Sequence, residues 1–134
     1  MEEIFEKIRN VLEKEEKVIF AYIFGSFLIN PDYANDIDIG VYVEGEIDSL
    51  FEERLALKIE NEIKDFIKKE VHVTILNNKP ASFFLTFFKN SKLIFSRDEN
   101  KRINFEMEKM REVFEYRRLE EEYEKYRLIR YGIE

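Results

Sequence analysis

Four short stretches of the chain have the hydrophobic pattern of β-strands. They cover residues 17–24, 36–43, 71–76 and 92–96. The first two are rich in β-branched and aromatic residues, and the third alternates apolar with polar side chains, a period of two that is typical of strands. A Gly lies close after each of the first two stretches, which indicates turns there. The pattern therefore predicts about four strands.

Helical spacing of apolar side chains predicts helices between and around these strands. Residues 2–15 carry five apolar side chains at helical intervals, and the long segment after Ser49 carries an apolar stripe. Ser49 and Glu52 have the spacing of a capping box, which predicts Ser49 as the cap of this helix. A short helix is expected within residues 80–90, where the phenylalanines indicate a buried element or an interface. A long charged helix without Gly or Pro is predicted over residues 98–131.

Together these elements predict a single domain over residues 1–134. Its class is α/β (α+β), with a small mixed sheet, helices packed on the sheet and a long C-terminal helix. A chain of 134 residues can bury a sizeable core, and we find neither an internal repeat nor a low-complexity linker that would mark a domain boundary. The order of the strands does not follow from the pattern.

The composition narrows the classes of function. Hydrophobic residues make up 45% and charged residues 38% of the chain, which fits a soluble globular protein with a heavily charged surface. The chain contains no Cys, which excludes a disulfide framework and a thiolate metal site. A net charge of −7 argues against strong, non-specific nucleic-acid binding but is compatible with a nucleotide bound as its Mg²⁺ complex.

The N-terminus also bears on location. It is acidic and amphipathic, unlike a signal peptide. No apolar run approaches the roughly 20 residues that a membrane helix needs. We therefore expect no membrane contact and a cytoplasmic location.

Asp36 and Asp38 alternate with two isoleucines in the second predicted strand. Because successive side chains of a strand point to opposite faces, both carboxylates lie on one face, about 6.6 Å apart along the strand. Two neighbouring carboxylates repel each other, and such a pair usually binds a divalent cation. Oxygen ligands suit Mg²⁺. Asp36 and Asp38 are therefore predicted metal ligands. The competing interpretation is a polar strand edge.

Gly25 and Ser26 lie where the first predicted strand ends. Glycine lets the backbone come close to a ligand, free N–H groups attract anions, and Ser26 adds a hydroxyl group. Alone, the two residues fit a strand-ending turn with a capping serine better than a binding site. Beside a carboxylate pair they suit a nucleoside triphosphate bound with Mg²⁺, because paired cations can stabilise an in-line displacement.

The order of strand, Gly25-Ser26, nine residues, Asp36-Ile37-Asp38 and strand resembles the nucleotidyltransferase superfamily related to polymerase beta. The small chain is similar to the minimal nucleotidyltransferases, which are commonly antitoxins paired with helical HEPN-domain toxins. The resemblance covers most of the chain. It implies an enzyme that uses Mg²⁺, or alternatively Mn²⁺, and transfers AMP from ATP to a tyrosine hydroxyl of a HEPN-type toxin. It also implies that Asp36 and Asp38 hold the metals and that Gly25 and Ser26 bind the phosphates.

The pattern departs from this superfamily at the position of its usual third carboxylate. That position holds His72, the only histidine of the chain. An imidazole is a poor ligand for Mg²⁺ and a better one for Mn²⁺ or Zn²⁺. His72 is therefore interpreted as a general base, as a ligand for a softer metal, as the mark of impaired chemistry, or as a strand histidine without a role. Glu70, on the same predicted face, is a candidate replacement. His72 joins Asp36 and Asp38 as a candidate catalytic residue.

The distal half of the helix over 98–131 carries more tyrosine than a small sheet could cover. Because Tyr and Arg are enriched at interface anchors, this half is interpreted as a surface for the toxin or for a second copy of the chain. A solvated helix is the competing interpretation. The alternative to an enzyme is a catalytically impaired antitoxin that acts by contact, through this helix and residues 80–90. A third alternative is a self-associating regulatory domain.

Overall fold

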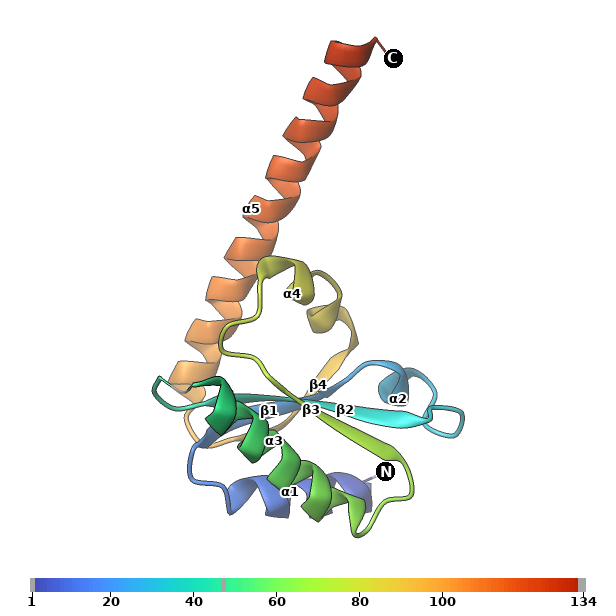
Figure 1. Cartoon of the computed structure of the whole chain (residues 1–134), viewed down its shortest axis with the longest axis vertical. Helices are drawn as coiled ribbons and strands as arrows, with labels where there is room; N and C mark the ends of the chain where they lie inside the picture. Colours follow the sequence, from blue (N-terminus) through green and yellow to red (C-terminus); the bar gives the residue numbers. More distant parts are fainter. Residues whose placement is uncertain (1, 47, 133–134) are drawn as a thin grey trace.

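A mixed four-stranded sheet in the order β3-β2-β1-β4 forms the centre of the computed structural model, which describes residues 2–46 and 48–132 (Figure 1). The strands are β1 (Val18–Phe24), β2 (Asp36–Val43), β3 (Glu70–Ile75) and β4 (Ser91–Ser96). β1 is antiparallel to both β2 and β4, whereas β3 runs parallel to β2. The prediction of a small mixed sheet is therefore confirmed.

Helices cover both faces of this sheet (Figure 1). The helices are α1 (Glu2–Glu13), α2 (Ser26–Ile29), α3 (Ser49–Lys64), α4 (Ala81–Phe87) and α5 (Glu99–Tyr131), and a 3₁₀ turn, η1 (Phe88–Asn90), follows α4. α1 and α3 lie on one face, and α4 lies with the first turns of α5 on the other. The parallel pairing of β2 and β3 needs a crossover connection, which α3 provides.

The two faces bury different kinds of side chain. The face under α1 and α3 is mainly aliphatic, and its fully buried residues include Leu12, Ile37, Ile39, Ile59 and Ile63. The other face is mainly aromatic and buries Phe20, Tyr22, Phe84, Phe87 and Phe105. Aromatic rings pack here face to face or edge to face, as in Phe20 and Tyr42, whose centres lie 4.7 Å apart.

The start of α3 corrects one sequence-based prediction. Asp48 caps the helix, and its Oδ1 accepts a hydrogen bond from the Phe51 backbone N–H at 2.8 Å. Ser49 is already inside the helix, so the predicted capping box of Ser49 and Glu52 is wrong. A carboxylate one residue earlier satisfies a free N–H group equally well and also interacts favourably with the positive end of the helix dipole.

Four strand ends also differ from the prediction by one residue, namely the start of β1, both ends of β3 and the start of β4. β3 begins at Glu70, one residue early, because Glu70 pairs with Asp36 in the parallel register. Leu76 follows the strand and is fully buried in the aromatic cluster. The connection between β1 and β2, predicted as a polar bridge, contains the short helix α2. These shifts leave the predicted faces of the strands unchanged.

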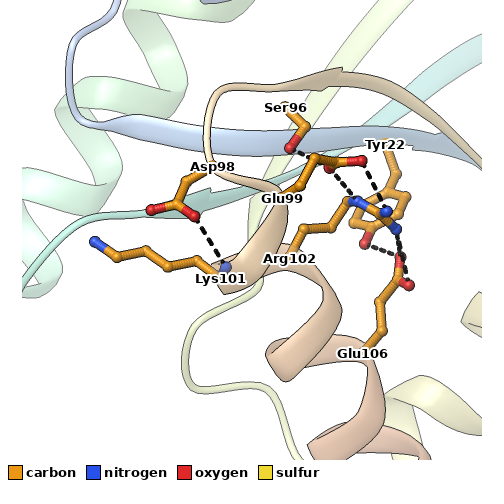
Figure 2. A network of polar contacts seen from close by, with 7 residues as sticks. All are labelled: Tyr22, Ser96, Asp98, Glu99, Lys101, Arg102 and Glu106. Atoms are coloured by element: carbon orange, nitrogen blue, oxygen red, sulfur yellow. Dashed lines mark hydrogen bonds and ion pairs between the residues drawn. The ribbon is translucent and has the colours of Figure 1, made fainter.

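A polar network fixes the first turns of α5 to the sheet (Figure 2). The Tyr22 hydroxyl donates a hydrogen bond to Glu106 at 2.5 Å, and Arg102 donates to Glu106 at 3.0 Å and to Glu99 at 2.9 Å. Ser96 of β4 also donates to Glu99, at 2.7 Å. Burial raises the pKa of Tyr22, and the hydrogen bond to Glu106 raises it further, so the hydroxyl stays protonated and remains a donor.

Beyond these turns, α5 leaves the body of the protein (Figure 1). Within Glu99–Tyr131, all of which the structure describes, Phe105 is the only buried residue. The helix begins after Asp98, which accepts a hydrogen bond from the Lys101 N–H at 3.1 Å, and ends at Gly132, whose φ of 62° gives a left-handed cap. The predicted long C-terminal helix is confirmed, and its distal part contacts little of its own chain.

Candidate active site

Gly25 turns the chain at the end of β1 and lies directly against Asp38. Its φ of +84° is a left-handed conformation that residues with a side chain rarely adopt. A Cβ atom here would lie 2.8 Å from Asp38 Oδ2, which is closer than real Cβ contacts come. The Gly25 N–H donates to the Asn90 carbonyl at 3.0 Å. This N–H is thus already engaged, so Gly25 contributes a close approach of the backbone to the Asp38 carboxylate rather than a hydrogen-bond donor.

Ser26 begins α2, and its side chain is exposed. Its carbonyl accepts the Asn30 N–H at 2.9 Å, and the Asn30 carbonyl accepts the Ala34 N–H at 3.1 Å, so a compact turn carries the chain from β1 to β2. Ser26 and Asp36 line one surface hollow of about 350 Å³, together with Tyr33. The predicted phosphate-binding serine and the first carboxylate therefore face the same space.

β2 places Asp36 and Asp38 on the face of the sheet that carries α4 and α5. The isoleucines that alternate with them are fully buried on the opposite face, as the sequence predicts. Asp38 lies opposite Phe24 of β1 and opposite His72 of β3. The sheet register thus brings the end of β1, the carboxylate pair and the histidine together.

The environment of Asp38 is unfavourable for a negative charge. Burial raises the pKa of Asp38 above its ordinary value, and the charge of Asp36 raises it further, while His72 partly opposes this shift. A divalent cation beside the two carboxylates would remove the repulsion and stabilise the charged form of Asp38. This is the electrostatic behaviour expected of a pair that binds a cation.

His72 is the third side chain of the group. Its Nε2 lies 3.7 Å from Asp36 Oδ2, and its side chain is 55% exposed. Glu70, the candidate replacement carboxylate, instead forms an ion pair with Lys64 of α3 at 3.4 Å. Because that ion pair draws Glu70 toward α3, His72 takes the third position in space as well as in sequence.

These donors fit a metal that is bound together with a substrate. Within residues 2–46 and 48–132, no three His, Cys, Asp or Glu side chains form a group that could hold a metal ion. Mg²⁺ is commonly held by one or two carboxylates and completes its coordination with water and substrate phosphates. Asp36 and Asp38 are both partly exposed, so they fit Mg²⁺, or Mn²⁺, that arrives with a nucleotide.

Sequence reasoning missed one wall of this site. α4, η1 and the end of β1 enclose a pocket of about 280 Å³, which we call the α4 pocket. Its lining residues are Phe24, Gly25, Ser82, Phe83, Thr86, Phe87 and Asn90. The apolar pattern of residues 80–90 predicts a buried element, and Phe84 and Phe87 are indeed buried, whereas Phe83 is only half-buried. The position of α4 beside Gly25 depends on the tertiary fold, and no local signal in the sequence indicates it.

Comparison with known families decides the class of this protein. Residues 6–100 match the family model described as polymerase beta, nucleotidyltransferase. This chain belongs to the polymerase beta nucleotidyltransferase family. The matched segment contains all four strands and every residue of the site that the sequence predicts.

Solved structures similar to this chain include chains from toxin–antitoxin complexes. One comes from a Shewanella oneidensis complex of a tri-AMPylated HEPN toxin with an MNT antitoxin, with 19% identity, a TM-score of 0.64, and coverage of 99% of this chain and 98% of that chain. Another comes from a toxin–antitoxin complex with AMP-PNP, with 20% identity, a TM-score of 0.65, and coverage of 97% and 98%. A third comes from the toxin–antitoxin MntA-HepT, with 18% identity, a TM-score of 0.63, and coverage of 100% of both chains. At these identities the similarity shows the shared fold.

Two further findings concern curated protein sequences and membrane-spanning helices. A search of curated protein sequences finds no match to this chain. Among the residues that the structure describes, none of the helices is both long and apolar enough to cross a membrane. The fold brings Gly25, Ser26, Asp36, Asp38 and His72 near one another, and their roles as site residues stay predictions.

Proposed function

We propose that this protein is a Mg²⁺-dependent nucleotidyltransferase that transfers AMP from ATP to a hydroxyl group of a partner protein. The carrying observation is the close approach of Gly25 to Asp38, since only a residue without a side chain leaves this place to the carboxylate, whose charge is disfavoured. Family membership supports the reaction class. The AMP-PNP complex among the similar structures supports an adenine nucleotide.

Each residue of the site has a role in this proposal. Asp36 and Asp38 hold the Mg²⁺, or Mn²⁺, which when bound neutralises charge on the phosphates. The Ser26 hydroxyl donates to the β,γ-phosphates, and the absence of a side chain at Gly25 lets the Asp38 carboxylate lie at the end of β1. The acceptor hydroxyl oxygen attacks the α-phosphorus, the bond from that phosphorus to the β-phosphate oxygen breaks, and pyrophosphate leaves with the electron pair. His72 accepts the hydroxyl proton at its Nε2, which is exposed beside Asp36.

The acceptor that we propose is a tyrosine of a HEPN-type toxin. Its support is the similar structure in which an MNT antitoxin accompanies a tri-AMPylated HEPN toxin. The hollow lined by Ser26 and Asp36 leaves Asp36 open from one side, and Tyr33 and Ile29, which also line it, are 82% and 69% exposed. A toxin segment could reach the site from that side, and its modification would silence the toxin.

A second candidate function is an antitoxin that neutralises its partner by contact, and the distal part of α5 favours it. Tyr116, Leu119, Tyr123 and Tyr126 follow a 3-4-3 spacing and are all exposed, so they form one apolar stripe, which we call the tyrosine stripe. The residues that flank it are Glu115, Glu120, Glu122 and Arg127. Glu115 and Glu122 are paired with Arg118 of the same helix, so the charges beside the stripe are largely balanced, and the exposed tyrosines, a residue type enriched at interface anchors, support a partner surface.

Transfer of label from α-labelled ATP separates the two functions. The reaction contains Mg²⁺ or Mn²⁺, this protein and its co-purified HEPN-type partner, with Asp38→Ala, His72→Asp and Tyr123→Ala beside the wild type. Label on the partner that disappears with Asp38→Ala supports the transferase. Toxin neutralisation that persists in Asp38→Ala but fails in Tyr123→Ala, without any label, supports the contact antitoxin. Label from His72→Asp alone would mean that His72 impairs the site.

A further inference from the structure

The α4 pocket lies beside the carboxylate site and shares residues with its edge. Gly25 lines the pocket and also lies against Asp38, and Phe24 lines it and pairs with Asp38 across the two central strands. Because Phe24 and Asp38 face the same side of the sheet, a ligand with phosphates at Asp38 has this pocket within reach. The pocket therefore belongs beside the nucleotide rather than on an unrelated surface.

Three phenylalanine rings form one side of the pocket. The ring centre of Phe24 lies 5.9 Å from that of Phe83 and 5.0 Å from that of Phe87, and Phe83 and Phe87 are 5.5 Å apart. Phe87 is buried, whereas Phe24 and Phe83 are half-buried and so keep surface available to a ligand. Planar nucleobases stack on aromatic side chains of this kind, largely without regard to base identity.

The rim of the pocket is polar. Ser82 and Thr86 lie one turn apart on the exposed side of α4 and offer hydroxyl groups, and Asn90 offers a side-chain amide. An amide carries both donors and an acceptor, as does the edge of a base such as adenine. Lys79 Nζ lies 5.7 Å from the centre of the Phe83 ring and adds a positive charge next to this rim. An aromatic floor with a polar, cationic rim suits a base that is attached to phosphates.

The size of the pocket favours a base over a whole ligand. Its volume of about 280 Å³ lies just under the roughly 300 Å³ at which pockets for drug-sized ligands begin. The hollow lined by Ser26 and Asp36 is larger, at about 350 Å³, but Tyr33, the aromatic residue among those that line it, is 82% exposed. That hollow is open to an acceptor, whereas the α4 pocket has the aromatic floor that a base needs.

We propose that the α4 pocket binds the base of the nucleoside triphosphate, with Phe83 as the stacking surface. This inference rests on the proposed function, since it assumes that the phosphates bind at Asp38. It makes residues 80–90 part of the substrate site rather than of a partner interface. Binding energy then comes from two separable places, the phosphates at the carboxylates and the base at α4.

Thr86→Trp tests this assignment because it fills the pocket from an exposed position. Affinities for Mg²⁺–ATP and for Mg²⁺–tripolyphosphate are measured by calorimetry on the full chain. We expect Thr86→Trp to weaken ATP binding by about tenfold or more, since stacking on an aromatic ring is worth that much, and to leave tripolyphosphate binding unchanged. Lys89→Trp is the matched control, because Lys89 is exposed on η1 next to the pocket without lining it.

Phe83→Leu serves as a second variant that removes the ring but keeps the apolar character, and circular dichroism checks the fold of all variants. A selective loss of ATP affinity in Phe83→Leu supports the base pocket. Equal ATP affinity in wild type, Thr86→Trp and Phe83→Leu, with tripolyphosphate still bound, overturns the base pocket and leaves the phosphate site standing. Absence of binding of either ligand to the wild type overturns the proposed function and the base pocket together.

Discussion

The two faces of the sheet are packed in different ways, although the same two central strands contribute to both. The face under α1 and α3 is filled with aliphatic side chains from helices and strands, and charged groups do not interrupt it among its described residues. The face under α4 and α5 has aromatic side chains near its centre, and Asp36, Asp38 and His72 lie at one edge of it. Aliphatic packing therefore supports the fold, and the second face is free to carry unfavourable charges and an open pocket.

The largest expected effect comes from the aliphatic face. Ile59→Ala in α3 should lower the free energy of unfolding by about 2–5 kcal/mol, because a fully buried side chain is lost and a cavity remains. Urea denaturation followed by circular dichroism measures the change. Leu57→Ala on the same helix is the matched control, since Leu57 is 54% exposed. If both variants lost equal stability, α3 would not be packed as described.

Gly25→Ala should have the next largest effect, and on function as well as stability. A side chain at φ +84° costs about 1–3 kcal/mol, and here the Cβ would also lie 2.8 Å from Asp38 Oδ2. We expect a lower melting temperature and loss of Mg²⁺–ATP binding. Gly45→Ala is the control, because φ is +79° there but no atom lies within 4 Å of the added Cβ. Normal ATP binding by Gly25→Ala would contradict a nucleotide site at this turn.

The sequence predicts the aliphatic face more fully than the other. Alternation within β2 is a local signal, so it correctly assigns Ile37 and Ile39 to the core and Asp36 and Asp38 to the opposite face. The α4 pocket depends instead on contacts between distant segments, such as the hydrogen bond from Gly25 to Asn90. The local pattern of apolar and polar residues gives no information about a contact between segments that are distant in the sequence. Spacing likewise failed at the start of α3, because neighbouring polar residues compete to cap one helix.

Tyr22→Phe should have a smaller effect, confined to the base of α5. The variant keeps the buried ring but removes the hydrogen bond to Glu106, which is worth about 1 kcal/mol. Arg102 still contacts Glu106, so the carboxylate keeps a partner. Urea denaturation should show the loss. Tyr42→Phe, on the same aromatic face, should change stability by less than about 0.5 kcal/mol, and a similar loss in both would argue against a specific role for the network in Figure 2.

The smallest expected change in stability has the opposite sign. Asp38→Asn should make the protein slightly more stable near neutral pH while it abolishes transfer. The pKa of Asp38 is higher in the folded state than in the unfolded state. At pH values between the two, the folded state therefore binds more protons than the unfolded state, and the free energy of unfolding decreases as the pH rises. Wild-type stability therefore falls across that interval, and the variant, which cannot ionise there, avoids the loss. The difference should vanish below the unfolded-state pKa and be complete above the folded-state pKa.

The same comparison becomes sharper in a second background. His72 opposes the raised pKa of Asp38, so His72→Gln should leave the Asp38 charge less compensated. Asp38→Asn should then gain more stability in the His72→Gln background than in the wild type, which a double-mutant cycle at several pH values measures directly. At saturating concentrations of Mg²⁺ and nucleotide, the wild type should instead be more stable than Asp38→Asn, because only the wild type has the Asp38 carboxylate that binds the cation. If Asp38→Asn stabilised the protein by the same amount with and without His72 and with and without Mg²⁺–nucleotide, the charge of Asp38 would serve a purpose other than binding a cation.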